Sequence, residues 1–269
     1  MDLNTVASIR QPRQRADLAL ARGEVLLGGG SWLFSEPQAH LTGLVDLTTM
    51  GWPAIETGPD GLTVAATCTF TELAEFAGPS EWLAEPLLRQ CCTALLGSFK
   101  VWNTATVGGN ICLALPAGPM TSLAAALDAD ALIWSPDGTD RRVPVLEFVT
   151  GVESTVLRPG EVLRAIEFPV RALASRTGYR KIALSALGRS GTVVIARLDA
   201  DGGFAVTVSA GTDRPIQLRF DALPTSAELE TRVRSIDNWY DDVHGTPDWR
   251  AAMSVLLAEQ LRNDLGASA

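Results

Sequence analysis

Residues 103–118 read NTATVGGNICLALPAG, and this stretch decides how the rest of the chain is interpreted. It contains a Gly-Gly-Asn sequence among small and apolar residues and has no charged side chain. Two interpretations are open. The glycines can mark a tight turn that requires a positive φ. Alternatively, the bare N–H groups of a glycine loop can form a concave, partly positive surface that binds phosphate oxygens.

A second glycine-rich stretch, LLGGGSWL at residues 26–33, follows a short apolar run that predicts a strand. It lacks the Gly-Lys-Ser or Gly-Lys-Thr of a P-loop, and Leu33 stands where the dinucleotide fingerprint has its third glycine. The sequence therefore argues against P-loop and Rossmann nucleotide sites. Two such stretches still favour a shared phosphate site, with free main-chain amides in both, over two unrelated turns.

Changes of pattern along the chain predict three units, at residues 1–52, 53–170 and 171–269. In the first unit, we expect a short helix over 12–23 that ends at a glycine, followed by strands.

The second unit predicts a helix that starts with a capping box, formed by Thr69 and Glu72. Apolar residues at three- and four-residue steps predict another helix over 80–99, which leads into a glycine loop at 106–110.

The third unit predicts a β-hairpin over 191–211 with its turn at 201–203. Its last helix is expected to start with Thr246 as N-cap and Pro247 at the first helical position. We expect one apolar face on this helix, made of Trp249, Met253, Leu256, Leu257 and Leu261.

Composition and charge exclude several classes of protein. The formal net charge of −9 comes without a basic stripe, which argues against a nucleic-acid partner. No apolar run approaches the roughly 18 residues of a membrane span, and the first residues are too polar for a secretory signal. The sequence therefore predicts a cytoplasmic protein without a membrane span.

The four cysteines are not spaced as metal or cluster ligands usually are. We expect Cys68, Cys91, Cys92 and Cys112 to be small buried apolar residues, and we expect no metal site. The two histidines lie far apart in the sequence and neither neighbours a nucleophile, so a hydrolase is disfavoured and no catalytic residue is assigned.

Together, LLGGGSWLF and TATVGGNICLALPAG resemble the paired flavin-binding motifs of the flavoprotein subunit of molybdenum-containing hydroxylases, the xanthine dehydrogenase and carbon monoxide dehydrogenase family. Other segments are similar to this family in the same order: GLTVAATCTFTELAE, LRPGEVLRAIEFP, YRKIAL and DDVHGTPDWRAAMSVLL. The resemblance covers nearly the whole chain. It implies an α+β fold in which a two-subdomain FAD-binding domain of the PCMH or vanillyl-alcohol oxidase-like type precedes a small α+β C-terminal domain.

The resemblance also implies an FAD site between the first two subdomains, with both glycine stretches at the pyrophosphate. Lys181 has a rival interpretation as an exposed strand lysine, and Trp32 can either stack on the cofactor or fill the subdomain boundary. The cofactor-binding positions carried over are Leu26, Leu27, Gly28, Gly29, Gly30, Ser31, Trp32, Leu33, Leu96, Thr106, Val107, Gly108, Gly109, Asn110, Leu163 and Lys181.

Three residues depart from the family's second motif. Pro119 replaces an acidic residue, and Leu113 and Leu115 replace polar ones, so one polar contact to the cofactor is expected to be lost.

The implied function is electron transfer. A large partner subunit would hold the molybdenum cofactor (molybdopterin), and a small subunit would carry [2Fe–2S] clusters that pass electrons to FAD on this chain and on to an external acceptor. The assembly would be a dimer of heterotrimers. Two alternatives stay open: a self-sufficient flavin oxidoreductase, and a flavin-free assembly subunit.

Overall fold

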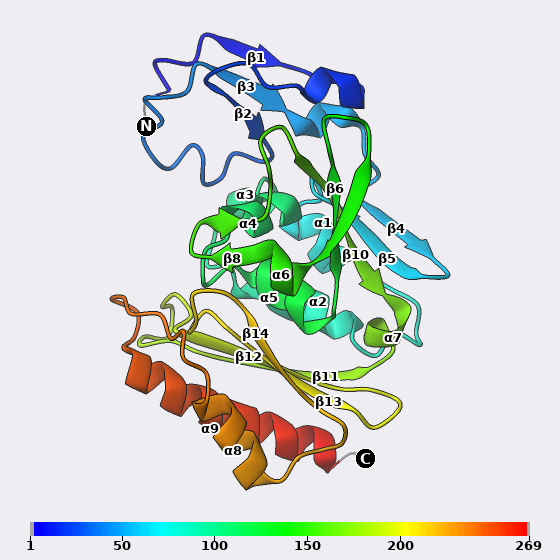
Figure 1. The fold of residues 1–269 in the computed structure, drawn as a ribbon, viewed down its shortest axis with the longest axis vertical. Coiled ribbons are helices and arrows are strands. Elements are labelled where there is room, and N and C mark those ends of the chain that lie inside the picture. Colours follow the sequence, from blue (N-terminus) through cyan, green and yellow to red (C-terminus); the bar gives the residue numbers. More distant parts are fainter. Residues whose placement is uncertain (1–2, 268–269) are drawn as a thin grey trace.

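Three units are stacked along the long axis of the molecule, as the computed structural model of residues 3–267 shows (Figure 1). We call β1 to η2 the N-terminal unit, β4 to α7 the central unit and β11 to α9 the C-terminal unit. The predicted division at residues 52 and 170 stays a prediction. Within residues 3–267, no helix is long and apolar enough to cross a bilayer.

The N-terminal unit is a three-stranded parallel sheet in the order β1-β3-β2. Its elements are β1 (Ser8–Arg10), η1 (Arg15–Leu18), β2 (Glu24–Leu27), β3 (Gly43–Asp46) and η2 (Leu47–Met50). The helix expected over 12–23 is only the single 3₁₀ turn η1. The guanidinium of Arg10 donates to the carbonyl oxygens of Asp17 and Ala19, which a longer helix would need for its own hydrogen bonds. Gly23 follows with φ +81°.

The central unit is built on a five-stranded antiparallel sheet in the order β4-β5-β10-β6-β7, with helices on one face. Its strands are β4 (Ile55–Gly58), β5 (Gly61–Ala65), β6 (Asp130–Trp134), β7 (Asp140–Pro144), β8 (Val149–Gly151), β9 (Ser154–Thr155) and β10 (Val162–Pro169). Its helices are α1 (Phe70–Glu75), α2 (Glu85–Ala94), α3 (Phe99–Trp102), α4 (Val107–Leu113), α5 (Pro119–Ala126), α6 (Val145–Phe148) and α7 (Val170–Leu173). This arrangement puts the largest apolar core between the sheet and α1, α2, α4 and α5.

Two predictions about this unit have different outcomes. The capping box at the start of α1 is confirmed, because Thr69 and Glu72 hydrogen-bond to each other's backbone amides. The helix predicted over 80–99 is too long, since α2 ends at Ala94 and the chain turns before α3. The indole N–H of Trp102 donates to the carbonyl of Leu95 and so satisfies an acceptor just past the helix end.

The glycine stretch at 106–110 is not the predicted loop but the start of helix α4. Thr106 is its N-cap, and its hydroxyl accepts from the amide of Gly109. Glycine has a low helix propensity, so the sequence pattern concealed this helix. Packing outweighs that propensity, because Gly108 lies directly against Ala66 at the end of β5.

The C-terminal unit is a four-stranded antiparallel meander, β11-β12-β13-β14, whose far face is covered by two helices (Figure 1). Its elements are β11 (Arg176–Ile182), β12 (Thr192–Leu198), β13 (Phe204–Ser209), β14 (Ile216–Phe220), α8 (Ser226–Arg234) and α9 (Pro247–Gly266). The predicted hairpin is confirmed, with Gly202 at φ +91° in its turn. The other face of the sheet packs on the central unit through Val193 and Ile195.

Helix α9 starts at Pro247 as predicted, with Thr246 as N-cap, although the Thr246 side chain makes no capping hydrogen bond. The predicted apolar face is wrong at Leu256, which is 47% exposed. Arg250 is buried instead, because its guanidinium donates to the carbonyls of Gly245 and Ala210. A charged residue on the core face cannot be recognised from hydrophobic periodicity.

Candidate functional site

The two glycine stretches, about 75 residues apart in sequence, meet where the N-terminal unit touches the central unit. A Cβ atom built on Gly28 would lie 2.7 Å from the hydroxyl of Thr106, and one on Gly29 would lie 1.3 Å from the carbonyl oxygen of Thr104. A side chain at either position would therefore push the stretches apart. The predicted convergence of the two motifs is present in the fold.

The first stretch, residues 26–33, ends strand β2 and then makes a glycine turn with free backbone donors. Within residues 3–267, no hydrogen-bond acceptor is found for the amides of Gly29, Gly30 and Ser31. Gly30 has φ +70°, a conformation that glycine adopts without strain, and its carbonyl accepts from Phe34. Successive free amides in such a turn form a concave anion-binding surface. The residues present therefore fit a pyrophosphate.

The second stretch uses its amides differently. The four N–H groups of residues 107–110 donate, in order, to Cys68 O at 2.8 Å, Ala66 O at 2.9 Å, Thr106 Oγ1 at 3.1 Å and Thr106 O at 3.0 Å. The expectation of free amides in both stretches is thus correct for the first and wrong for the second. A Cβ atom on Gly108 would lie 2.4 Å from that of Ala66, so this glycine permits close packing.

Exposure separates the remaining positions. Trp32 is 41% exposed and Leu96 is 49% exposed, so both apolar side chains are accessible to a ligand or a partner. Ser31 and Gly109 are exposed, and Leu33 and Asn110 are half-buried.

Four of the other positions are buried, namely Thr106, Val107, Gly108 and Leu163. The half-buried Leu26 packs in the core of the N-terminal unit, next to the equally half-buried Leu27.

Leu163 belongs to the same neighbourhood through the backbone. It precedes Arg164 at an irregularity of β10, and the carbonyl of Arg164 accepts from the amide of Ala66. Ala66 is also the residue on which Gly108 packs. The side chain of Leu163 itself is buried in the central core.

Lys181 comes from the C-terminal unit. It lies on β11, two residues after Tyr179, and alternate residues of a strand share a face. Tyr179 packs against the core of the central unit, so Lys181 is turned to the same side. Lys181 is exposed, and both interpretations of its role remain predictions.

Asn110 bears on the departures noted in the sequence. Its side-chain oxygen accepts from the amide of Met120, in the first turn of α5, at 2.9 Å. Pro119 begins α5 and brings no donor, and Gly118 at the N-cap brings no capping side chain. The amide side chain of Asn110 thus ties the glycine stretch to α5.

The seam between the N-terminal and central units contains a group that sequence reasoning missed. The guanidinium of Arg164 lies over the rings of Trp52 and Trp134, at 4.5 and 5.6 Å, and the two rings pack edge to face at 5.4 Å. Burial lowers the pKa of Arg164. No local pattern marks this cluster, because its members come from three separate segments.

Two cavities of about 580 and 560 Å³ lie elsewhere, and neither is lined by the glycine stretches. The first is a polar hollow on the sheet of the central unit, and the second lies beside η1 and the turn after β6. Among residues 3–267, no group of three or more His, Cys, Asp or Glu residues could hold a metal ion.

Comparisons with known proteins support the resemblance seen in the sequence. Residues 16–171, more than half of the chain, match the model of the FAD binding domain in molybdopterin dehydrogenase. The putative xanthine dehydrogenase FAD-binding subunit XdhB of Escherichia coli (strain K12) is 27% identical over 246 residues, which span 86% of this chain and 83% of that protein. The carbon monoxide dehydrogenase medium chain of Afipia carboxidovorans is 28% identical over 134 residues, 49% of this chain and 46% of that one.

Among solved structures, a chain of carbon monoxide dehydrogenase from Hydrogenophaga pseudoflava superposes with a TM-score of 0.82 at 19% identity, covering 96% of each chain. The predicted α+β fold, with its C-terminal extension, is thereby confirmed. The family match covers both glycine stretches and the strands and helices that bring them together. The chain therefore belongs to the family of FAD-binding domains of molybdopterin dehydrogenases, whose members are subunits of oxidoreductases.

Proposed function

We propose that this chain holds FAD at the contact between its two glycine stretches and transfers electrons as the flavoprotein subunit of a heterotrimeric molybdenum hydroxylase. The single observation that supports this most is the first stretch. Its three free amides have no acceptor among residues 3–267, while the second stretch lies directly against it. Such a surface suits the negative charge of a pyrophosphate.

The residues of this chain would bind and orient the cofactor. The amides of Gly29, Gly30 and Ser31 would donate to the phosphates, and the accessible side chains of Trp32 and Leu96 would contact its apolar parts. Lys181 would approach from the C-terminal unit. FAD supplies the redox chemistry when bound, so no side chain of this chain needs to act as a general base.

The partners follow from the same proposal. The relatives are named as an FAD-binding subunit and a medium chain, which supports a place between a large molybdenum-cofactor subunit and a small [2Fe–2S] subunit. Electrons would arrive from the clusters and leave to an external acceptor. A cytoplasmic dimer of such heterotrimers completes the proposal.

Pro119 makes flavin retention the point to test. The visible absorption spectrum of the purified chain is measured before and after incubation with FAD, and any released cofactor is identified. We expect a flavin spectrum with one FAD per chain. A chain that carries no bound flavin after incubation with saturating FAD would overturn the proposal and favour the flavin-free assembly subunit.

A further inference from the structure

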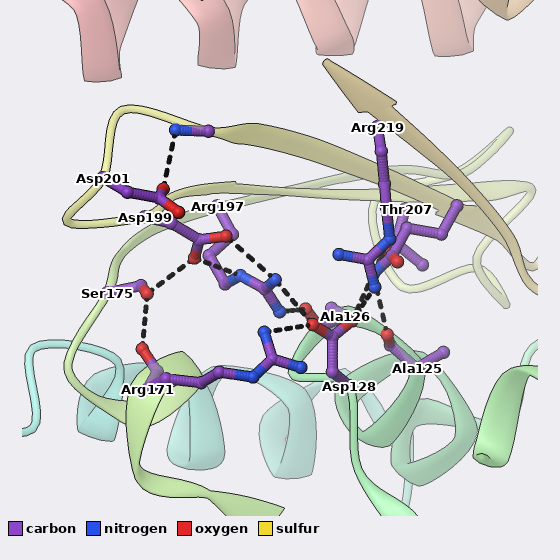
Figure 2. Close-up of polar contacts among 12 residues, drawn as sticks. Ala125, Ala126, Asp128, Arg171, Ser175, Arg197, Asp199, Asp201, Thr207 and Arg219 are labelled. Atoms are coloured by element: carbon purple, nitrogen blue, oxygen red, sulfur yellow. Dashed lines mark hydrogen bonds and ion pairs between the residues drawn. The ribbon is translucent and has the colours of Figure 1, made fainter. Parts of the chain in front are cut away.

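One buried carboxylate, that of Asp128, helps to hold the C-terminal unit on the central unit. Asp128 follows α5 in a left-handed conformation, with φ +52°, and its side chain is only 7% exposed. Figure 2 shows three arginine side chains turned toward it, two of them from the C-terminal sheet. This convergence joins segments that are far apart in the sequence.

The contacts of the carboxylate are short and fill both oxygens. Oδ2 accepts from Arg197 at 2.7 Å and pairs with Arg171 at 3.0 Å, and Oδ1 accepts from Arg219 at 2.5 Å and Gln217 at 3.2 Å. Although burial alone would raise it, the hydrogen bonds from Arg197 and Arg219 hold the pKa of Asp128 at about 2. Asp128 is therefore ionised at neutral pH.

Arg197 is the buried partner, with a side chain that is 1% exposed. Besides Asp128, it donates to the carbonyl of Ala126 and to both carboxylate oxygens of Asp199 (Figure 2). All of its donor groups point to acceptors that fix one position of β12 against the end of α5. Buried networks of this kind select one arrangement more than they add stability.

Helix α5 connects this network to the cofactor site. In the loop before α5, the carbonyl of Pro116 accepts from the amide of Ala210 at 2.9 Å, and within α5 the hydroxyl of Ser122 hydrogen-bonds with that of Ser209 at 2.7 Å. The start of α5 is tied to the glycine stretch through Asn110. All eight residues of α5 are buried, so the helix is a rigid spacer between the two.

We propose that Asp128 is a positioning residue for the cofactor site: it fixes the C-terminal sheet, and with it Lys181, relative to the glycine stretches. The part that concerns Lys181 rests on the function proposed above. The docking itself does not, because it is visible in the contacts of the protein alone.

The test uses Asp128→Asn, which keeps the shape of the side chain and removes its charge. Glu259→Gln is the control, since Glu259 accepts two hydrogen bonds from Arg262 within α9, on the side of the C-terminal sheet that faces away from this interface. The first readout is hydrogen exchange at the amide of Ala210 without FAD. We expect Asp128→Asn to speed this exchange at least about tenfold and the control to leave it unchanged.

The second readout is the dissociation constant of FAD. We expect Asp128→Asn to raise it about tenfold in the wild-type background and less than about twofold when Lys181→Ala is already present. A purely structural role would weaken FAD binding equally in both backgrounds. Equal effects, or an Asp128→Asn protein that matches the control, would overturn the proposal.

A cross-link provides the rescue. Ser122→Cys with Ser209→Cys places two thiols where two hydroxyls now touch at 2.7 Å, on either side of the interface. We expect the oxidised cross-link to restore FAD binding in Asp128→Asn, and reduction to remove the rescue. If wild-type protein binds no FAD, the proposed function fails, while exchange at Ala210 still decides whether Asp128 docks the sheet.

Discussion

The two glycine stretches have similar composition and opposite uses of their backbone. Residues 29–31 have free amides and a positive φ at Gly30, whereas residues 107–110 spend every amide inside the protein at the start of α4. Gly29 and Gly108 both allow close approach, but Gly29 approaches another motif and Gly108 approaches its own core. In the first stretch, glycine leaves the amide donors exposed. In the second stretch, it lets helix α4 pack close enough to support the first.

The largest effect is expected from Gly29→Ala. The new Cβ would lie 1.3 Å from the carbonyl oxygen of Thr104, so the first stretch must move away from the second and its amides must turn. We expect FAD affinity to fall at least a hundredfold, about 2.8 kcal/mol, in a titration followed by flavin fluorescence. Gly58→Ala, with open space at its Cβ, is the control. Undiminished affinity would mean that this stretch does not hold the phosphates.

Gly108→Ala should act on stability instead. Its Cβ would lie 2.4 Å from that of Ala66, in a core that cannot give way easily, and the free energy of unfolding should fall by about 2 kcal/mol. Urea unfolding of the apo protein measures this, with Gly151→Ala as control because nothing lies near its Cβ. A Gly108→Ala variant with normal stability but no FAD binding would contradict the structural role given to the second stretch.

Two substitutions at Thr106 distinguish the helix-capping role of its hydroxyl from the packing of its methyl group. Thr106→Ala removes the acceptor of the Gly109 amide and should cost about 1 kcal/mol of stability, whereas Thr106→Ser keeps the hydroxyl and should cost less. The freed amide becomes available to a ligand. Thermal unfolding with and without FAD distinguishes the two variants, and equal losses for both would show that the methyl group, not the cap, matters.

The smallest of the expected effects is that of acid, which should destabilise the first stretch before the second. Glu24 begins the strand that leads into the first stretch, and its hydrogen bonds with Arg10 and the amide of Ala21 lower its pKa to about 2. Because this lies below the ordinary value of 4.5, the stabilisation is full above about pH 4.5 and is lost as the pH falls toward 2.

Hydrogen exchange over residues 24–33 and 106–113, compared between pH 6 and pH 3, measures this difference. We expect the ratio of the exchange rate at pH 3 to that at pH 6 to be raised in the first segment only. Among residues 3–267, no carboxylate accepts a hydrogen bond from the amides of residues 107–110. Glu24→Gln should remove the pH dependence. A parallel rise in both segments would show that the stretches open as one unit.

Much of the fold was predictable because local rules and packing agree. The capping box at Thr69 and the turn residues 201–203 specify their elements without distant partners. Helix α4 was missed because two glycines lower its helix propensity, and the close contact with Ala66 that accounts for Gly108 has no signal in the local sequence. The Asp128 network has no local signal at all, since Arg197 and Arg219 follow it by 69 and 91 residues.

All four cysteines lie between residues 68 and 112, in the central unit that carries the second glycine stretch. Burial raises the pKa of Cys92 and Cys112 to about 12, and it also raises the pKa of Cys68 and Cys91 well above the ordinary thiol value. Thiols in this state react slowly with alkylating reagents at neutral pH. Cys112 is only half-buried, whereas Cys68, Cys91 and Cys92 are buried. The rate at which iodoacetamide labels these three thiols in the native protein therefore reports how often the core of the central unit opens.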